Sequence, residues 1–222
     1  MAESGDLPVN VLICTATEFE AGLLRRELAD VGGVRLVKTG VGPVNAAHGT
    51  TLAIAESRPD VIICCGIGGA YPSSGLAIGD AVCASDEIYG DLGADSPDGF
   101  LDMRQLGFAV AHGDTPLFNE IPMQVFPLSR RARFVTVSTC TGTESAARHL
   151  EARTQGVVEN MEGAAVAHVA YLHQIPVGEV RGISNIVTNR DTASWRVAEA
   201  AFVAQQAVIQ WVRTLCPTSF RT

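Results

Sequence analysis

The chain of 222 residues is 47% hydrophobic and 18% charged, a balance that can bury the core of one domain. Its formal net charge of -8 argues against a nucleic-acid or anionic-membrane surface, because either surface needs clustered lysine and arginine side chains. No apolar run approaches the roughly 18 residues of a membrane span, and the first ten residues lack a basic signal region. These features predict a cytoplasmic protein with a small-molecule ligand, no nucleic-acid partner and no membrane partner.

The first part of the chain alternates short apolar strands with helices. Apolar runs rich in β-branched side chains predict strands over residues 9–15, 35–40, 61–65 and 81–86. Helical periodicity predicts helices over residues 18–29 and 45–57. The continuous apolar run at 61–65 is typical of a central strand that is buried on both faces.

The periodic pattern fails between residues 91 and 126, where Gly, Pro and Asp are frequent. A segment of this length without regular structure is typical of a lid or of a region that contacts a partner. Beyond it, strands are predicted over residues 133–138, 157–159 and 175–180, and helices over 144–153, 161–173 and 195–215. The alternation predicts a single α/β domain over residues 1–222, with a central mixed, mainly parallel twisted sheet flanked by helices and loose ends at 1–8 and 216–222.

Neither the cysteines nor the glycine-rich stretches indicate a cofactor. The six cysteines lack metal-ligand spacing and are interpreted as small core residues in a reducing compartment, so no metal is expected. Gly40-Val41-Gly42 and Gly66-Ile67-Gly68-Gly69 both fail the dinucleotide pattern G-x-G-x-x-G, and neither is a P-loop. The glycines therefore either let a backbone approach a flat ligand or let two elements pack closely.

Three polar residues near the ends of predicted elements are candidates for chemistry. Glu20 completes a capping box with Thr17, and the same carboxylate could take a proton from water. Glu162 stands among small apolar residues, where an acid is costly unless it is paired, whereas Glu159 has the pattern of a surface residue. Asn185 follows the apolar run and a flexible Gly-Ile-Ser, so it either turns the chain or reads a ligand beyond a strand end.

Six motifs occur in the order found in the superfamily of purine nucleoside phosphorylases and methylthioadenosine/S-adenosylhomocysteine nucleosidases. The motifs lie at residues 18–20, 38–42, 66–69, 78–80, 158–163 and 181–185. The chain therefore resembles this superfamily over nearly its whole length. Residues 66–72, 141–144 and 181–191 are most similar to the branch that removes hypoxanthine from futalosine in an alternative menaquinone pathway.

The resemblance implies a role for each candidate residue. Glu20 is similar to the acid that activates the attacking water, and Glu162 to the carboxylate that holds the ribose hydroxyls, with Met161 against the sugar. The resemblance also implies that the reaction needs no cofactor and that the chain forms a homo-oligomer based on a dimer. It implies that the base pocket is lined by Gly66, Ile67, Gly68 and Gly69.

Two departures from the superfamily indicate the substrate and the nucleophile. Asn185 stands where methylthioadenosine nucleosidases have an aspartate, and an amide donates to a 6-oxopurine but cannot hand over a proton. Phosphorylases carry cations in the loop after the first strand and before the third-strand glycines, positions held here by residues 15–18 and 64–65. Without those cations, water is the expected nucleophile.

Several alternatives stay open in the sequence. The chain could be a methylthioadenosine/S-adenosylhomocysteine nucleosidase, a phosphorylase, or a nucleoside-binding module without turnover. Arg104 or Arg190 could bind a carboxylate on the 5′ substituent, although solvation at the surface is the simpler role for either. The aromatic residue that stacks on the base in the family has no counterpart, since Thr141-Gly142-Thr143 stands there.

Overall fold

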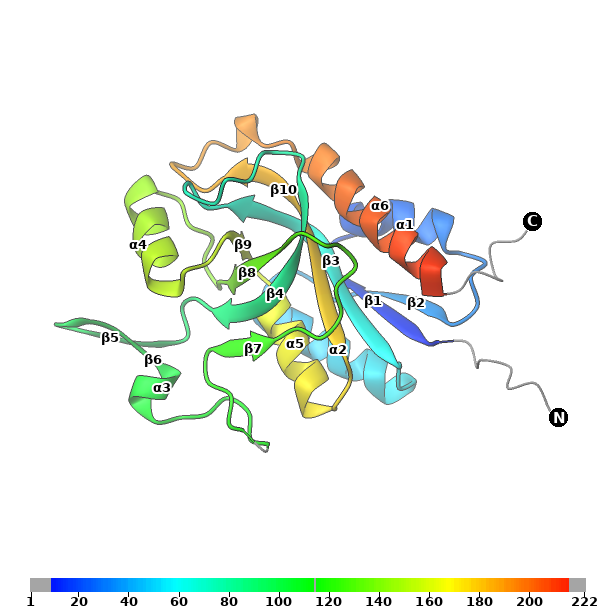
Figure 1. Cartoon of the computed structure of the whole chain (residues 1–222), viewed down its shortest axis with the longest axis horizontal. Coiled ribbons are helices and arrows are strands. Elements are labelled where there is room, and N and C mark those ends of the chain that lie inside the picture. The colour runs from blue at the N-terminus through cyan, green and yellow to red at the C-terminus, as the bar shows by residue number, and fades with distance from the viewer. Residues whose placement is uncertain (1–8, 114, 216–222) are drawn as a thin grey trace.

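The chain opens with three parallel strands joined by helices, as the sequence pattern predicts (Figure 1). The structure, a computed structural model, describes residues 9–113 and 115–215. The opening elements are β1 (Val11–Thr15), α1 (Glu18–Glu27), β2 (Val34–Lys38), α2 (Pro43–Glu56) and β3 (Val61–Ala70). The ends at 1–8 and 216–222, for which loose structure is expected, lie outside the described residues.

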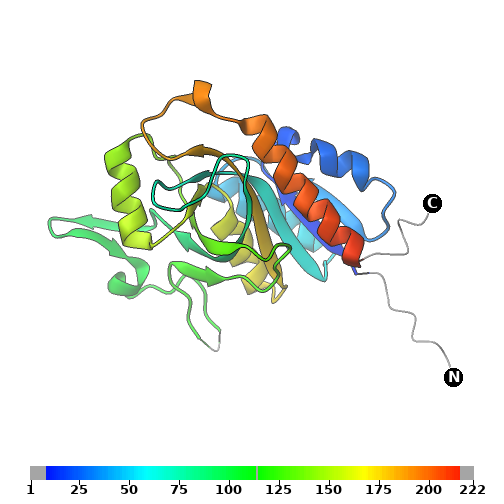
Figure 2. The same cartoon turned by 45° about the horizontal axis from the view of Figure 1, so that its top comes forward.

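The remaining elements complete the sheet and its helical cover. They are β4 (Ala81–Tyr89), β5 (Gly93–Ser96), β6 (Gly99–Asp102), α3 (Met103–Leu106), β7 (Glu120–Pro122), β8 (Arg131–Thr136), α4 (Glu144–Thr154), β9 (Val158–Asn160), α5 (Gly163–Leu172), β10 (Val177–Ile186), the 3-10 helix η1 (Thr192–Ser194) and α6 (Val197–Leu215). The segment at 91–126 thus contains a short hairpin, a one-turn helix and a strand. In Figures 1 and 2 the β5–β6 hairpin projects away from the body of the domain.

The central sheet is mixed and mainly parallel, which confirms the predicted fold class. Its strand order is β10-β4-β8-β9-β3-β1-β2, with β7 beside β4. Strand β10 also pairs with β3, so five strands close into a ring. Helices α1 and α6 pack together on one side of the sheet, and α2 and α5 pack together on the other (Figure 1).

Strands β3 and β10 are longer than the sequence indicates. The glycines at 66–69 and the 182–184 stretch were expected to be corners or flexible ends, but they lie inside paired strands. The parallel ladder between the two strands supplies the hydrogen bonds, and this overrides the low strand propensity of glycine. A bulge between Ile183 and Asn185 shifts the register near the end of β10.

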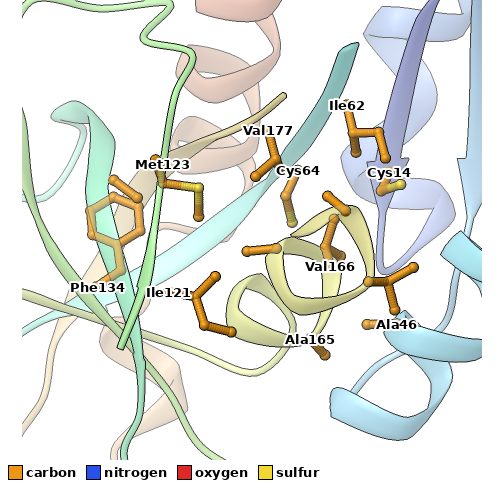
Figure 3. Packing of buried hydrophobic residues seen from close by; sticks show 14 of the residues in the cluster. Cys14, Ala46, Ile62, Cys64, Ile121, Met123, Phe134, Ala165, Val166 and Val177 are labelled. Carbon is orange, nitrogen blue, oxygen red and sulfur yellow. The ribbon is translucent and has the colours of Figure 1, made fainter. Parts of the chain in front are cut away.

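The core between the sheet and α5 is built largely from small side chains. Helix α5 is buried over most of its length, and four of its ten residues are alanines. Figure 3 shows Val166 of this helix on the side that faces Cys64 of β3, and Ala165 near Ala46 of α2. Because small residues let a helix approach closely, the first turn of α5 lies directly against Glu87 of β4, Thr136 of β8 and Glu179 of β10.

In the described part of the chain, the longest and most apolar helices still fall short of what crossing a bilayer requires.

Candidate active site

A cavity of about 400 Å³ opens where the carboxyl ends of β1, β3 and β10 meet. Ligands of open α/β sheets bind at such strand ends. The Asp, Glu, Lys, Arg and His side chains in its described wall are three glutamates and one arginine, namely Glu20, Glu159, Glu162 and Arg181. The predicted residues Met161 and Asn185 also line the cavity, so the structure brings together candidates separated by 165 positions, from 20 to 185.

Glu20 both caps α1 and faces the cavity. Its Oε2 accepts hydrogen bonds from the amide and hydroxyl of Thr17 at 3.0 and 2.9 Å, which completes the predicted capping box. Its Oε1 accepts from the amide of Ile67 at 3.0 Å, which ties the acid to β3. Each carboxylate oxygen has further acceptor capacity. The cap therefore fixes the carboxylate in place and leaves it able to accept from a ligand.

Gly66 supports this arrangement from behind the cavity wall. A Cβ at this position would lie 2.6 Å from both Oε1 of Glu20 and Nη1 of Arg181. Gly66 itself does not line the cavity, whereas Ile67, Gly68 and Gly69 do. The sequence left two roles open for these glycines. Close packing is the role of Gly66, because any side chain there would displace two charged groups.

Glu162 is 5% exposed and is held by two donors. Its Oε1 accepts from the amide of Gly42 at 3.0 Å, and its Oε2 accepts from Nη1 of Arg181 at 3.2 Å. The acid stands just before α5, which begins at Gly163 rather than at the predicted Met161. The helix starts there because the side-chain oxygen of Asn160 accepts from the amides of Glu162 and Gly163.

Arg181 belongs to the motif at residues 181–185, but the sequence analysis assigned it no role. It lies inside β10, is 2% exposed, and its Nε donates to Glu179 at 2.6 Å. It also donates to the carbonyl of Ile67 and to Asn160. A charge in the middle of an apolar strand was the available signal, since such a charge must have buried partners.

Two further acids converge behind Arg181, away from the cavity. Glu87 and Glu179 are fully buried, and a Cβ on Gly163 would come within 2.5 Å of carboxyl oxygens of both. Burial, together with the neighbouring charge of Glu179 and a hydrogen bond to it, raises the pKa of Glu87 well above its ordinary value. The protonated form of Glu87 is therefore favoured by its surroundings.

Glu159 is 6% exposed, so the expectation of a surface residue is wrong. Its Oε1 accepts from the amide of Thr141 at 2.9 Å, and its Oε2 accepts from the hydroxyls of Tyr71 and Thr141. These bonds attach the loop before α4 to β9. They place Thr141 in the cavity wall, whereas Thr143 caps α4.

Asn185 lies within β10, opposite Gly69 of β3, so it does not turn the chain. Its Oδ1 accepts from the hydroxyl of Ser184 at 2.7 Å, and its Nδ2 donates to the carbonyl of Ile186 at 3.3 Å. This orientation leaves one amide N–H for a ligand. Gly69 leaves room for the amide, because a Cβ there would lie 3.2 Å from Nδ2.

The remaining wall is largely apolar and includes side chains that the sequence did not single out. Phe19, Val41, Trp195 and Val197 line it, together with Cys140. Cys140 was expected in the core, but it is partly exposed and its Sγ lies 3.1 Å from Sδ of Met161. The other described cysteines, Cys14, Cys64, Cys65 and Cys83, are free and buried as predicted, and Cys216 lies outside the described residues.

The charges of the cavity favour a neutral or cationic group over a phosphate. Arg181 is the one cation in the described part of the wall, and Glu162 and Glu179 already pair with it. Three acids surround the same space. Among residues 9–113 and 115–215, no group of three or more His, Cys, Asp or Glu side chains is arranged to hold a metal ion.

The segment at 91–126 does not contribute to the described cavity wall. Its position therefore gives no support to a lid formed within one chain. Arg104 in this segment stacks on Phe118 and pairs with Glu120, away from the cavity. Arg190, by contrast, lies with its Cζ 4.9 Å from the ring centre of Trp195, at the cavity edge.

The fold and this site define a member of a known class of protein. Residues 10–215 match the phosphorylase superfamily, and the chain belongs to it. A nucleosidase structure from Neisseria meningitidis, that of 5′-methylthioadenosine/S-adenosylhomocysteine nucleosidase with methylthio-immucillin-A, has the same fold. The two structures share a TM-score of 0.78 and 19% identity over 92% of this chain and 98% of the other.

Within the superfamily, the chain is similar to futalosine hydrolases. It is 38% identical to futalosine hydrolase of Streptomyces coelicolor over 84% of this chain and 81% of the relative. It is 32% identical to futalosine hydrolase of Thermus thermophilus over 89% of this chain and 92% of that relative. These identities over most of both chains place it in the futalosine hydrolase family.

Proposed function

We propose that this protein hydrolyses the N-glycosidic bond of futalosine and releases hypoxanthine, a step of the alternative menaquinone pathway. The identity to futalosine hydrolases supports the substrate. One observation carries the chemistry: Glu20, Glu162 and Asn185 face a single cavity whose described wall has no cation free to hold phosphate. Water is therefore the nucleophile, and no cofactor takes part.

Glu20 is the base in this proposal. The oxygen of a water molecule bonds to C1′ of the ribose as the bond to the purine nitrogen breaks, and the bonding electrons leave with the purine. The carboxylate of Glu20 takes the proton from that water. Its fixed bonds to Thr17 and Ile67 hold it in one orientation, so little reorganisation is needed when the proton moves.

Glu162 holds the ribose in this proposal. The bonds from Gly42 and Arg181 leave acceptor capacity on its two oxygens for the 2′- and 3′-hydroxyls, with Met161 against the sugar. Its negative charge also stabilises the positive charge that develops on the ribosyl group. The same acid thus binds the substrate and favours the transition state.

Asn185 reads the base in this proposal. Its free amide N–H donates to a 6-oxopurine, and Ile67, Gly68 and Gly69 line the space for the ring. An adenine would place its 6-amino donor against this donor and leave both groups unpaired. The mismatch costs about 1 to 3 kcal/mol, which favours hypoxanthine as the leaving base.

Arg190 is the candidate partner for the carboxylate of the futalosine side chain, because it stands at the cavity edge and Arg104 does not. Arg190→Gln should raise KM for futalosine about 10-fold and leave KM for inosine unchanged, since inosine lacks the carboxylate. Arg196→Gln, which removes an exposed arginine paired with Glu199, is the matched control. Equal changes for futalosine and inosine would contradict this assignment.

One experiment separates the candidate functions. The purified protein is incubated with futalosine, inosine and methylthioadenosine, each with and without phosphate, and the released base is identified by chromatography. Hypoxanthine from futalosine at a rate independent of phosphate is expected. Adenine from methylthioadenosine would indicate the nucleosidase alternative, dependence on phosphate a phosphorylase, and binding without release a sensor module.

The chain is also proposed to form a homo-oligomer based on a dimer. Two exposed apolar residues of the cavity wall, Phe19 and Val41, are 53% and 49% exposed. Helix α2 adds Val44 and Leu52, also exposed and about two turns apart on one face. Such residues on neighbouring elements suit a contact with a second copy. Sedimentation velocity should give the mass of a dimer, and a monomer would contradict it.

The protein is proposed to work in the cytoplasm. Its described cysteines are all free, and four of the five are buried in the core. Free thiols are typical of a reducing compartment. Fractionation of the producing cells would test this location.

A further inference from the structure

The buried pair Glu87 and Glu179 has no place in the reaction described above. Glu87 comes from β4 and Glu179 from β10, and these strands are neighbours in the sheet. Both side chains are 0% exposed. Their carboxyl groups meet beneath Gly163 at the start of α5, where there is no room for another side chain.

The hydrogen bonds around the pair show where a proton must be. Glu87 accepts from the side-chain amide of Asn160 and from the hydroxyl of Thr136. Glu179 accepts from Arg181 through Oε1, but its buried Oε2 has no partner if both acids are ionised. A proton on Glu87 supplies that partner and removes the repulsion between two adjacent carboxylates.

The pair lies directly behind the arginine that holds Glu162. Nε of Arg181 bonds to Glu179 at 2.6 Å, and Nη1 of the same guanidinium bonds to Glu162 at 3.2 Å. The single positive charge of Arg181 is thus shared between an acid behind it and an acid in the cavity wall. If Glu179 were neutral, Arg181 would neutralise Glu162 alone.

We propose that Glu179 is a positioning residue that neutralises Arg181 from behind, so that Glu162 keeps its negative charge toward the ribosyl cation, and that Glu87 holds the proton that makes this arrangement possible. This assignment rests on the proposed hydrolysis. The charge available for catalysis is then set by two residues that never touch the substrate.

The guanidinium, thiol and phenol groups that face the pair from the neighbouring elements do not titrate near neutral pH. Arg181 stays charged, since the pKa of its guanidinium is raised by nearby thiol and carboxyl groups despite burial. Burial also raises the pKa values of the thiols and phenols that interact with Glu87 or Glu179, which are Cys64, Cys65, Cys83, Tyr71 and Tyr89. Glu162 faces the pair across Arg181 and is the charge that the pair protects.

The test is a pH profile of kcat for three variants. Glu179→Gln should lower kcat about 10-fold at pH 6, because Glu162 alone must then compensate Arg181. Activity should recover as pH rises, since Glu87, freed from its charged neighbour, ionises and replaces the lost charge. Glu87→Gln should match the parent protein, because the amide N–H of glutamine can donate to Oε2 of Glu179 as the protonated acid does. The double variant should stay low at every pH.

Two results would overturn the assignment. One is full activity of Glu179→Gln at pH 6. The other is a double variant whose kcat falls at pH 6 and recovers at higher pH in the same way as that of Glu179→Gln. If Glu179→Gln does not fold, infrared spectroscopy of the parent protein decides. The carbonyl band of a protonated carboxylic acid should be present at pH 7 and absent in Glu87→Gln; its absence from the parent contradicts the proposal. The band does not depend on turnover, so failure of the proposed function is distinguished from failure of this inference.

Discussion

Buried acids stand on two sides of Arg181, and the two sides meet the cost of burial differently. On the cavity side, Glu20 and Glu162 accept hydrogen bonds from backbone amides and have acceptor capacity left toward open space. On the far side, Glu87 and Glu179 lie together beneath Gly163, where no space remains, and we propose that Glu87 holds a proton there. Burial by itself therefore does not identify a catalytic acid. The two acids proposed to act in the reaction, Glu20 and Glu162, are in addition held by fixed donors and face a cavity.

The largest effect should come from Glu20, if the cavity-side acids carry the chemistry. Glu20→Gln should reduce kcat for hypoxanthine release about 1,000-fold, because an amide cannot take a proton from water. The fold should be kept, since the amide oxygen can still accept from Thr17 and only the bond from the amide of Ile67 is lost. Glu18→Gln, in the first turn of α1 two residues before Glu20 and exposed in a pair with Arg25, is the control and should keep full activity. Comparable turnover in Glu20→Gln and the parent would show that Glu20 is not the base.

A change in the packing around Glu87 and Glu179 should affect the stability of the protein. Gly163→Ala would force a Cβ to within 2.5 Å of both rear acids and should lower the free energy of unfolding by about 3 kcal/mol, a large effect for one methyl group. Gly22→Ala is the matched control: this glycine lies within α1 with nothing within 4 Å of an added Cβ. The control should stabilise the protein by about 0.5 to 1 kcal/mol. Urea unfolding measures both changes, and equal values for the two variants would show that the rear pair is not tightly packed.

The smallest change should appear in base preference. Asn185→Asp should shift the ratio of kcat/KM for adenine over hypoxanthine nucleosides by about 10-fold, because the acid can accept from a 6-amino group. The measurement compares methylthioadenosine with inosine under the same conditions. Ser184→Ala tests the orientation of the amide, since Ser184 donates to its oxygen. An unaltered ratio in Asn185→Asp would mean that other parts of the cavity select the base.

The local patterns carried much of the fold, but they underestimated β3 and β10. The sequence pattern predicted that both strands end before the glycines of β3 and the Gly-Ile-Ser of β10, because glycine is a poor strand former. Only the partner strand, far away in the sequence, supplies the hydrogen bonds that keep both segments extended. The helix α5 starts two residues later than the pattern indicates, and the side chain of Asn160 accepts from the amides of Glu162 and Gly163 at that start.

The sequence by itself determined the alternation of strands and helices, the capping box at Glu20 and the need of Glu162 for a partner. These features depend on residues close together along the chain. Tertiary structure alone decided that Glu159 is buried, that Cys140 and Trp195 line the cavity and that Glu87 meets Glu179. These facts depend on contacts between distant strands, and no local periodicity encodes them. Arg181 lies between the two cases: its charge within an apolar strand predicts buried partners, but only the folded sheet shows that they face one another across it.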